Sequence, residues 1–558
     1  KRLVGRILVF GTIVFATIIL ARVLWLTLLT PRTGSRYHDP VVATQVVRGS
    51  ITDRNGTLMA VEVPYYACAL MLQEIEDLNR IATLIAPVLS VDAQRIIQEA
   101  GERQTYYLVK RRMTPQEHQE LSDLVQTHRL RGVSMEKRYG RYYPQQHHAA
   151  QIIGFTNTEN RGIEGLELSL ERLLFPYPEI GTTITRGADV ALTIDLDLQY
   201  LLDMQASAID QEHYSDSVVG IIMEARTGEI LAATSYPWYD PNRYQQSDVE
   251  SRQNKVVTAM YEPGSVFKLF SLAAELEAGQ ADFDEPFFCD GSYTFTMDGG
   301  GTTQVNCVAA HGMVTPQTMI QHSCNGAAAH WALQTDDHLF RETLVNLGFG
   351  TAWETQMPGS IAGRLSPVQT WSGRSKATIA FGQEIATTSL QLVAAATALA
   401  TGGHVMQPAI VQSVRSADGT LVLQFEPTVA HSEVLSTEVI DTILGGMEMA
   451  VSSGGTATRT AVKGVRVGAK TGTAQIPDPV SGTYSTDSFL ASTLAVVPVD
   501  DPQYIIYIGV ANPKGSTIWG SNIAAPAIGS IIADMVRQGR LTSETSERIT
   551  LEASAVQP

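Results

Sequence analysis

The chain has 558 residues, of which 44% are hydrophobic, so it is long enough for more than one domain with ordinary buried cores. Its 57 acidic and 40 basic residues give a formal net charge of -17, which argues against nucleic acid as the main partner. Basic residues still gather between Arg103 and Arg141, a cluster that indicates either a solvated face or a contact with a protein partner or anionic lipid.

An apolar segment near the amino terminus predicts a membrane anchor. It runs from Ile7 to Leu29, long enough to cross a bilayer core, and carries a single charge, Arg22. A cleaved signal peptide would have a shorter apolar core and a small-residue cleavage site. Three basic residues precede the segment and favour a cytoplasmic amino terminus. We therefore expect residues 1–35 to form a cytoplasmic stub and a transmembrane helix, with the rest of the chain outside the cytoplasm.

The chain beyond the anchor changes character near residue 195. Residues 36–195 alternate short strand-like and helical stretches, whereas an α/β layout follows from about residue 196. The first two strands predicted there, Val218–Ala225 and Glu229–Pro237, flank a tight-turn signal, Arg226-Thr227-Gly228.

Further elements follow in chain order. Helices are predicted over 265–279, 316–333, 387–401 and 436–452. Strands are predicted around Lys470 and over Tyr504–Ala511, and residues 546–558 read as a polar tail.

Three short motifs stand in one order along the chain: Ser265-Val-Phe-Lys268, Ser323-Cys-Asn325 and Lys470-Thr471-Gly472. Ser265 opens an apolar helical run after Pro263 and Gly264, so residues three apart lie on one face of the helix, one turn apart. The hydroxyl of Ser265 is therefore predicted near the Lys268 amine, beside the free N–H groups and the positive dipole end of the helix. That arrangement suits a nucleophile with part of an oxyanion hole.

The base function of Lys268 depends on its pKa. A lysine amine with a pKa of about 10.4 is neutral in fewer than about one molecule in a thousand at pH 7. Burial or a second cation disfavours the charged form, and a pKa shift of about three units corresponds to roughly 4 kcal/mol. Lys470 is the second cation that the motifs offer.

The ordered motifs S-x-x-K, S-x-N and K-T-G are the signature of penicillin-binding proteins and serine β-lactamases. The sequence resembles a class B penicillin-binding protein, one of the monofunctional peptidoglycan D,D-transpeptidases. Six further segments resemble blocks of this family: Arg48–Ala60, Gly154–Leu174, Leu192–Gln199, Glu224–Asn242, Phe381–Leu392 and Lys470–Gln475. The resemblance implies an α+β fold with a transmembrane helix, a mixed α/β pedestal of the dimerisation type over residues 36–195, and a transpeptidase domain over 196–545. In that domain an antiparallel sheet is covered by helices, as in serine β-lactamases, and residues 546–558 remain a tail.

The resemblance also implies how the first two motifs act. Ser265 would attack the penultimate D-Ala carbonyl of a stem peptide, and Lys268 would take the hydroxyl proton. Ser323 would pass the proton to the departing D-Ala amine. Asn325 would orient both Lys268 and the substrate amide. A second stem-peptide amine would then take the acyl group and complete the cross-link.

The third motif would bind and polarise the substrate. Lys470 would supply charge, and the hydroxyls of Thr471 and Thr473 would bind the terminal carboxylate. The backbone N–H groups of Ser265 and Thr473 would hold the oxyanion. Gly472 would leave room for the substrate against the strand. No cofactor and no metal are implied.

Partners and location also come from the resemblance. Stem peptides and β-lactams are the expected ligands. The anchor and pedestal are expected to contact a SEDS-family glycan polymerase and divisome membrane proteins. The protein is expected to cross the bacterial cytoplasmic membrane once, with the catalytic domain in the periplasm.

Two features favour a division (FtsI-like) role: K-T-G rather than K-S-G, and a pedestal without long insertions. Ser-Cys-Asn and the pair Cys289 and Cys307 favour an elongation role. A non-catalytic β-lactam sensor and a serine β-lactamase are the other functions considered.

The four cysteines leave one question open. Cys289 and Cys307 flank a hairpin-like, Gly-rich segment. Their spacing is compatible either with a disulfide between them or with two separate thiols. No paired Cys or His ligand spacing supports a metal site. Cys324 is expected to be a structural thiol that faces away from the substrate, and Cys68 a buried hydrophobic residue.

Two other patterns suggest rival chemistry and are set aside. His311, His322 and His330 lie near Ser323 in sequence, but no G-x-S-x-G elbow accompanies them, so local packing is expected. Gly299–Gly301 could cradle a phosphate, yet no Lys-Ser/Thr pair follows, so a flexible loop is expected.

Overall fold

The structure is a computed structural model that describes residues 45–178, 184–297, 300–477 and 484–542. The predicted membrane segment Ile7–Leu29 and the predicted tail 546–558 lie outside these residues. Among the described residues, no helix is long and apolar enough to cross a membrane. The elements discussed below belong to one compact unit that comprises residues 46–177 and the chain from residue 185 onward.

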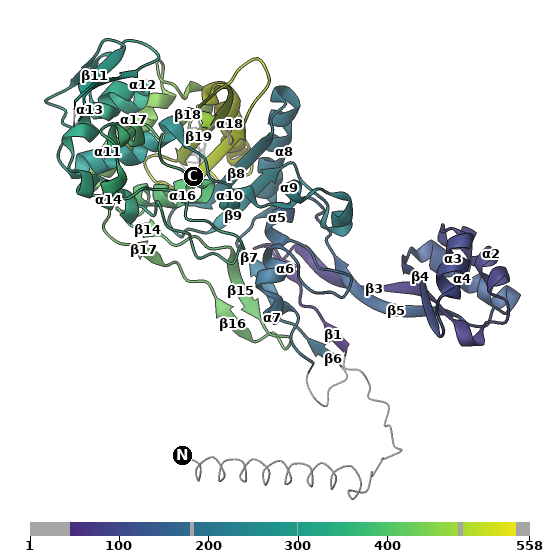
Figure 1. Ribbon diagram of the computed structural model, residues 1–558. Coiled ribbons are helices and arrows are strands. Elements are labelled where there is room, and N and C mark those ends of the chain that lie inside the picture. The colour runs from purple at the N-terminus through teal and green to yellow at the C-terminus, as the bar shows by residue number, and fades with distance from the viewer. Residues whose placement is uncertain (1–44, 179–183, 298–299, 478–483, 543–558) are drawn as a thin grey trace, which may run out of the picture. The chain divides into compact units, whose positions relative to one another are not determined.

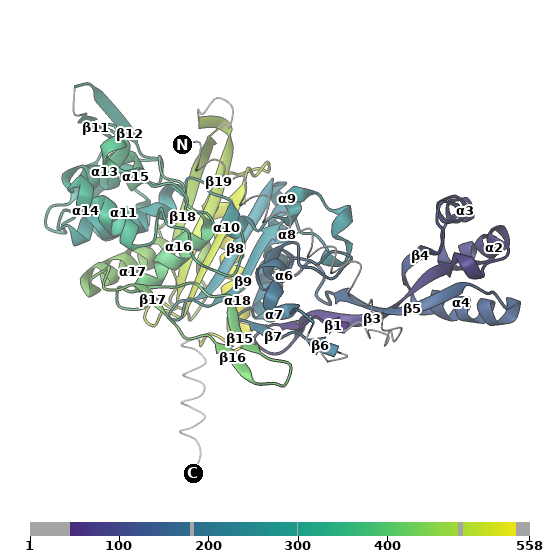
Figure 2. The same cartoon turned by 60° about the horizontal axis from the view of Figure 1, so that its bottom comes forward.

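A five-stranded antiparallel sheet organises the second half of the chain (Figures 1 and 2). Its strands, in order across the sheet, are β18 (Gly468–Pro477), β19 (Tyr484–Val497), β20 (Tyr504–Ala511), β8 (Ser217–Glu224) and β9 (Ile230–Tyr236). The predicted turn between the first two strands in sequence is confirmed: Gly228 has φ +78, and its N–H donates to the carbonyl of Glu224 at 3.0 Å. The strand predicted around Lys470 is β18, at the edge of the sheet.

Both faces of this sheet are covered by helices, and side chains alternate between them. In β8, Val218 and Ile222 pack with apolar residues of α8 (Leu196–His213) and α18 (Gly520–Arg537). Val219 and Ile221 pack in a second cluster. The helices that contribute to that cluster include α11 (Lys268–Glu277), α16 (Ser389–Ala396) and α17 (Thr437–Val451). Burial on both faces explains why these strands are continuous apolar runs in the sequence.

The predicted helices are confirmed except at one point. The helix expected over 265–279 begins with a 3-10 turn, η4 (Gly264–Phe267), and continues as α11. The single helix expected over 316–333 is wrong, because the chain forms α12 (Pro316–His322) and α13 (Asn325–Gln334). Ser323 ends α12 in the left-handed conformation, with φ 58 and ψ 44, and Cys324 caps α13 by accepting a hydrogen bond from the N–H of Ala327. The second motif therefore stands at a junction between two helices.

The segment between Cys289 and Cys307 forms the predicted hairpin. Its strands β11 (Ser292–Thr296) and β12 (Thr302–Asn306) pair antiparallel, next to the strand pair β10 (Phe287–Cys289) and β13 (Gly312–Val314). The described part of Gly299–Gly301 has positive φ at both Gly300 and Gly301, consistent with the predicted loop.

A second sheet has seven strands and combines distant parts of the chain. Along the sheet these are β16 (Leu421–Gln424), β15 (Val411–Arg415), β7 (Asp189–Leu192), β2 (Ile51–Thr52), β3 (Leu58–Met71) and β4 (Tyr106–Met113), with β5 (Val133–Tyr142) paired to β3. Apolar residues at the far end of β3 pack with helices α2 (Leu78–Leu89), α3 (Ala93–Gly101) and α4 (Pro115–His128). The sheet of the predicted pedestal thus takes two strands from beyond residue 400.

The unit contains further helices. They are α5 (Ala150–Ile153), α6 (Gly165–Ser169), α7 (Glu171–Leu174), α9 (Val249–Arg252), α10 (Lys255–Thr258), α14 (Asp337–Asn346) and α15 (Ser375–Ala380).

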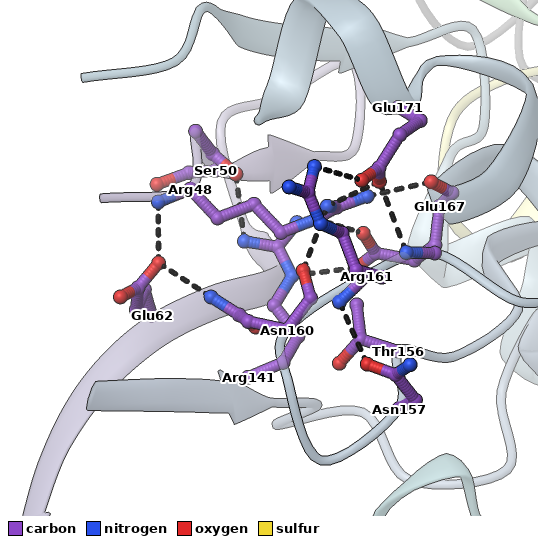
Figure 3. Close-up of polar contacts among 12 residues, drawn as sticks. Arg48, Ser50, Glu62, Arg141, Thr156, Asn157, Asn160, Arg161, Glu167 and Glu171 are labelled. Atoms are coloured by element: carbon purple, nitrogen blue, oxygen red, sulfur yellow. Dashed lines mark hydrogen bonds and ion pairs between the residues drawn. The ribbon is translucent and has the colours of Figure 1, made fainter. Parts of the chain in front are cut away.

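A buried ion network joins the two pedestal segments that resemble family blocks (Figure 3). The guanidinium of Arg48 contacts Glu167 at 2.6 Å and Glu171 at 2.6 Å, and Arg141 contacts the second oxygen of Glu167 at 2.5 Å. Arg48 and Glu167 have fully buried side chains, and the backbone N–H of Arg48 donates to Glu62. Arg141, one of the basic residues of the first third, is therefore a buried structural residue rather than part of a solvated face.

Candidate active site

The turn that carries Ser265 is held against strand β18. Gly264 has φ +57, and its N–H donates to the carbonyl of Gly382 at 3.0 Å. A Cβ at Gly264 would lie 2.9 Å from the Cβ of Ala474 in β18, so glycine allows the close approach. Lys268 follows one turn later, and its Nζ lies 3.1 Å from Ser265 Oγ. The structure thus brings the first motif together as the spacing predicts.

The contacts of Lys268 leave its lone pair for Ser265. Its Nζ donates to the carbonyl of Ser323 at 2.6 Å and to Oδ1 of Asn325 at 2.6 Å, and both atoms can only accept. The Asn325 amide is oriented by its Nδ2, which donates to the carbonyl of Asn306 at 2.8 Å. A neutral amine has two N–H donors and one lone pair. With both donors engaged, the lone pair is left for the two hydroxyls that lie 3.1 Å from Nζ, those of Ser265 and Ser323, and it can accept the Ser265 hydroxyl proton.

Burial prepares Lys268 for this role. The side chain is fully buried, and desolvation lowers the pKa of Lys268 to about 8. Desolvation also lowers the pKa of Lys470, which is equally buried, and the neighbouring charge of Lys268 lowers it further. The sequence suggested burial and the charge of Lys470 as causes of a lowered Lys268 pKa, and burial is the first cause for both amines.

The hydroxyl of Ser323 bridges the two lysines. Its Oγ lies 3.1 Å from Nζ of Lys268 and 2.9 Å from Nζ of Lys470, which also donates to the carbonyl of Thr471 at 2.8 Å. A hydroxyl can accept from an amine and still donate its own proton. This amine–hydroxyl–amine chain is therefore a path for moving a proton across the cleft.

The residues of the three motifs line one cleft. Those that face it are Ser265, Ser323, Asn325, Thr471, Gly472 and Thr473. Thr473 Oγ1 accepts a hydrogen bond from the N–H of Gly520 at 3.2 Å, which leaves its hydroxyl proton to donate to an anion.

Close packing around position 472 explains why the third motif has a glycine there. A Cβ at Gly472 would lie 2.7 Å from Ser492 Oγ, 3.0 Å from Val266 Cγ2 and 3.2 Å from the carbonyl of Pro263. The sequence suggested that this glycine leaves room for substrate. The geometry shows that it lets strand β18 approach the turn that carries the nucleophile.

Several cleft residues have no motif to identify them. Trp519, Thr456, His311 and His322 also line the cleft, and Trp519 is 46% exposed. The rings of His311 and His322 are nearly parallel, with centroids 5.7 Å apart. His330 instead hydrogen-bonds Tyr293, as expected for local packing. A lone aromatic residue before a helix gives no sequence signal for a site.

All four cysteines fall within the described residues, and each is a free thiol. Sγ of Cys289 and Sγ of Cys307 lie 3.7 Å apart, so the structure contains two thiols where the sequence left a disulfide open. Cys324 is fully buried beside them, and Cys68 is buried in the pedestal core, both as expected.

Comparisons with known proteins decide the family. The sequence model of the penicillin binding protein transpeptidase domain matches residues 218–533, more than half of the chain. The chain belongs to the penicillin-binding protein transpeptidases. The model of the penicillin-binding protein dimerisation domain matches residues 43–174 of the same transpeptidase.

Relatives of this transpeptidase match along most of its length. It is 26% identical to peptidoglycan D,D-transpeptidase FtsI of Escherichia coli over 545 residues, which cover 93% of this chain and 89% of the relative. It is 28% identical to stage V sporulation protein D of Bacillus subtilis over 512 residues, 87% of this chain and 77% of the relative. The crystal structure of penicillin-binding protein 3 from Mycobacterium tuberculosis with aztreonam shares the fold, with a TM-score of 0.70 at 22% identity, over 90% of this chain and 98% of that one.

These matches confirm the family resemblance drawn from the motifs. The transpeptidase is a class B penicillin-binding protein of the FtsI type, and it is a serine-type enzyme. The α+β catalytic fold and the dimerisation domain are confirmed, whereas the transmembrane helix lies outside the described residues.

Proposed function

We propose that this penicillin-binding protein cross-links peptidoglycan stem peptides through an acyl-enzyme on Ser265. The observation that carries the proposal is the geometry of Lys268, whose two N–H donors are taken by Ser323 and Asn325 while its Nζ lies 3.1 Å from Ser265 Oγ. That arrangement makes Lys268 a general base for a serine nucleophile.

The first half-reaction moves one proton through the three motifs. Ser265 Oγ bonds to the penultimate D-Ala carbonyl carbon as its proton passes to Lys268. The amide C–N bond of the terminal D-Ala then breaks. Ser323 donates its hydroxyl proton to the leaving amine and recovers a proton from Lys268 or Lys470, both within 3.1 Å.

The second half-reaction releases Ser265. An amine of a second stem peptide attacks the ester carbonyl, loses a proton to the same relay, and displaces the serine oxygen, which regains its proton. The product is a new amide between two stem peptides. A β-lactam follows only the first half-reaction, because its leaving amine stays attached to the acyl group and blocks the acceptor.

Substrate binding is assigned to the third motif. Lys470 is proposed to supply charge, and the hydroxyls of Thr471 and Thr473 to hold the carboxylate of the terminal D-Ala or of a β-lactam. The backbone N–H groups of Ser265 and Thr473 are proposed to hold the oxyanion. The free hydroxyl proton of Thr473 supports this assignment.

The cellular role proposed is septal wall synthesis, because a relative named FtsI matches over 93% of the chain. We place the protein in the cytoplasmic membrane, anchored by Ile7–Leu29, with a SEDS-family glycan polymerase and divisome membrane proteins as partners. Depletion should then produce filamentous cells, whereas rounded cells would indicate the elongation role. Replacing Ile7–Leu29 by an unrelated apolar helix should impair growth at matched protein levels while penicillin acylation stays normal, since a partner is held through the anchor.

Turnover of the purified protein tests the reaction. With a pentapeptide donor and an acceptor amine, we expect stoichiometric release of D-Ala and a cross-linked product. Acylation by penicillin should persist for hours, whereas deacylation in under a second would make the protein a β-lactamase. Acylation without any turnover of donor and acceptor would make it a β-lactam sensor.

A further inference from the structure

Four side chains beside the second motif bring their donor atoms together. They are Cys289, Cys307, His311 and Cys324, and their Sγ and imidazole nitrogen atoms all lie within 4.8 Å of one another. Cys289 and Cys324 are fully buried, and the other two are half-buried. Three thiols and an imidazole are ligands that zinc takes in proteins.

Three of the six distances between donor atoms match the edges of a coordination tetrahedron, and the other three are no longer than 4.8 Å. With Zn–S bonds of about 2.3 Å and Zn–N bonds of about 2.0–2.1 Å, a tetrahedral site has S–S edges of about 3.8 Å and S–N edges of about 3.5 Å. Sγ of Cys307 lies 3.7 Å from Sγ of Cys289 and 3.7 Å from Sγ of Cys324. Nδ1 of His311 lies 3.5 Å from Sγ of Cys289.

The backbone around the cluster is arranged for thiolates. The N–H of Gly326 donates to Sγ of Cys307 at 3.3 Å, and the N–H of Ala327 donates to Sγ of Cys324 at 3.5 Å. Both N–H groups belong to the first turn of α13, whose dipole favours negative charge at that end. Such N–H···S bonds are the outer contacts that orient metal ligands.

We propose that Cys289, Cys307, His311 and Cys324 bind one zinc ion in a closed tetrahedral site. Four protein ligands leave no open position for a water or a substrate, so the ion is structural. Soft thiolates favour zinc over magnesium, calcium or manganese, whose preferred ligands are oxygens. Each ligand comes from a different place: the end of β10, the chain after β12, the chain before β13, and the junction of α12 and α13.

The zinc ion fixes the position of the α12–α13 junction, which carries Ser323 and Asn325. Cys324 lies between Ser323 and Asn325, the two residues that accept the hydrogen bonds of Lys268. Cys307 follows Asn306, whose carbonyl orients the Asn325 amide. Two of the four zinc ligands therefore sit next to the groups that leave the lone pair of Lys268 facing Ser265, and the zinc ion positions the S-x-N motif without touching substrate.

The metal content of the protein tests the zinc site without an activity assay. A result against the zinc site is therefore distinguishable from a result against the proposed transpeptidase function. The full-length protein, purified without chelator and dialysed, should carry about one zinc per chain by elemental analysis. Cobalt exchanged into it should show the intense visible bands of a tetrahedral ion and a thiolate charge-transfer band. Mass spectrometry that finds no metal and a Cys289–Cys307 disulfide would overturn the proposal.

Variants separate ligands from neighbours. Cys307→Ser and His311→Asn should each lower zinc affinity by at least about tenfold. Cys68→Ser, which changes a buried thiol in the pedestal, and His322→Asn, which changes the ring stacked on His311, should keep the metal. If the ligand variants retain zinc as tightly as these controls, the ligand set is wrong.

Zinc removal from the unchanged protein tests the positioning role, so the result does not depend on a variant that fails to fold. Chelation should slow acylation of Ser265 by about tenfold or more, and added zinc should restore it. The thermal transition should also fall on chelation and recover with zinc. An acylation rate that is unchanged after complete removal of zinc would overturn the role given to the ion.

Discussion

The pKa of Lys268 sets how acylation must depend on pH. Burial lowers this pKa to about 8. The neutral amine that accepts the Ser265 proton then rises from about 1% of molecules at pH 6 to about 50% at pH 8. Without the shift, about 0.03% would be neutral at pH 7 instead of about 9%, a factor of about 300, or about 3 kcal/mol. The acylation rate should therefore rise about fiftyfold between pH 6 and pH 8 and level off above pH 9.

The assay is the second-order rate constant for acylation by a fluorescent penicillin between pH 5.5 and pH 10. The sign follows from the lowered pKa: protonation inactivates the base, so activity is lost as the pH falls through about 8. A rate that kept rising tenfold per pH unit up to pH 10 would show a lysine with its ordinary pKa. A rate independent of pH would show that proton transfer to Lys268 is not part of acylation. Either result would refute the claim that burial prepares Lys268 to act as the base.

Three further predictions concern the lysines, the glycine of the third motif and the buried ion network. Lys268→Arg should abolish acylation because a guanidinium is not deprotonated near neutral pH, whereas Lys470→Arg keeps a cation and should retain part of the rate; equal, full rates in both would exclude these roles. Gly472→Ala would place a Cβ 2.7 Å from Ser492 Oγ and displace the turn that carries the nucleophile. The acylation rate should therefore fall about a hundredfold, with little change in secondary structure by circular dichroism. An unchanged rate would show that close packing at Gly472 is not needed for acylation. Glu167→Gln should lower the free energy of unfolding of the region around it by about 3–5 kcal/mol in denaturant titrations, because two buried guanidiniums lose their shared partner. Glu250→Gln, which changes an exposed ion pair, should change this free energy little. Similar effects of the two substitutions would contradict the ion network.

The grouping of the motif residues at one site was the easiest part to predict from the sequence. Ser265 and Lys268 are three residues apart on one helix, so local geometry alone places them together. The order of the three motifs added Ser323, Asn325 and Lys470, although no local rule predicts that Ser323 Oγ bridges both amines. That contact requires β18 to lie beside the α12–α13 junction, which is a property of the tertiary fold.

The errors of prediction have the same origin. Helix-forming residues flank Ser323 on both sides, and the helix breaks where Ser323 is left-handed and Cys324 is extended. Strands β15 and β16 join a sheet that begins more than 300 residues earlier, through pairing that periodicity cannot reveal.

The cysteine cluster has no sequence signal for a related reason. Its four ligands come one at a time from the end of a strand, two connecting segments and a junction of helices, without the C-x-x-C spacing that marks a zinc site in a sequence. Cys324 lies inside the second motif, between two residues whose catalytic roles already explain that motif. Only the fold brings Cys289 and Cys324 to one point.

Covalent labelling of Ser265 tests the central claim most directly. Intact-protein mass spectrometry after incubation with penicillin should show one adduct, and peptide mapping should place it on Ser265. Ser265→Ala should abolish the adduct with the fold intact, whereas Ser134→Ala, in the other S-x-x-K of the chain, should label normally. An adduct that persists in the Ser265→Ala protein and maps to another serine would contradict the account.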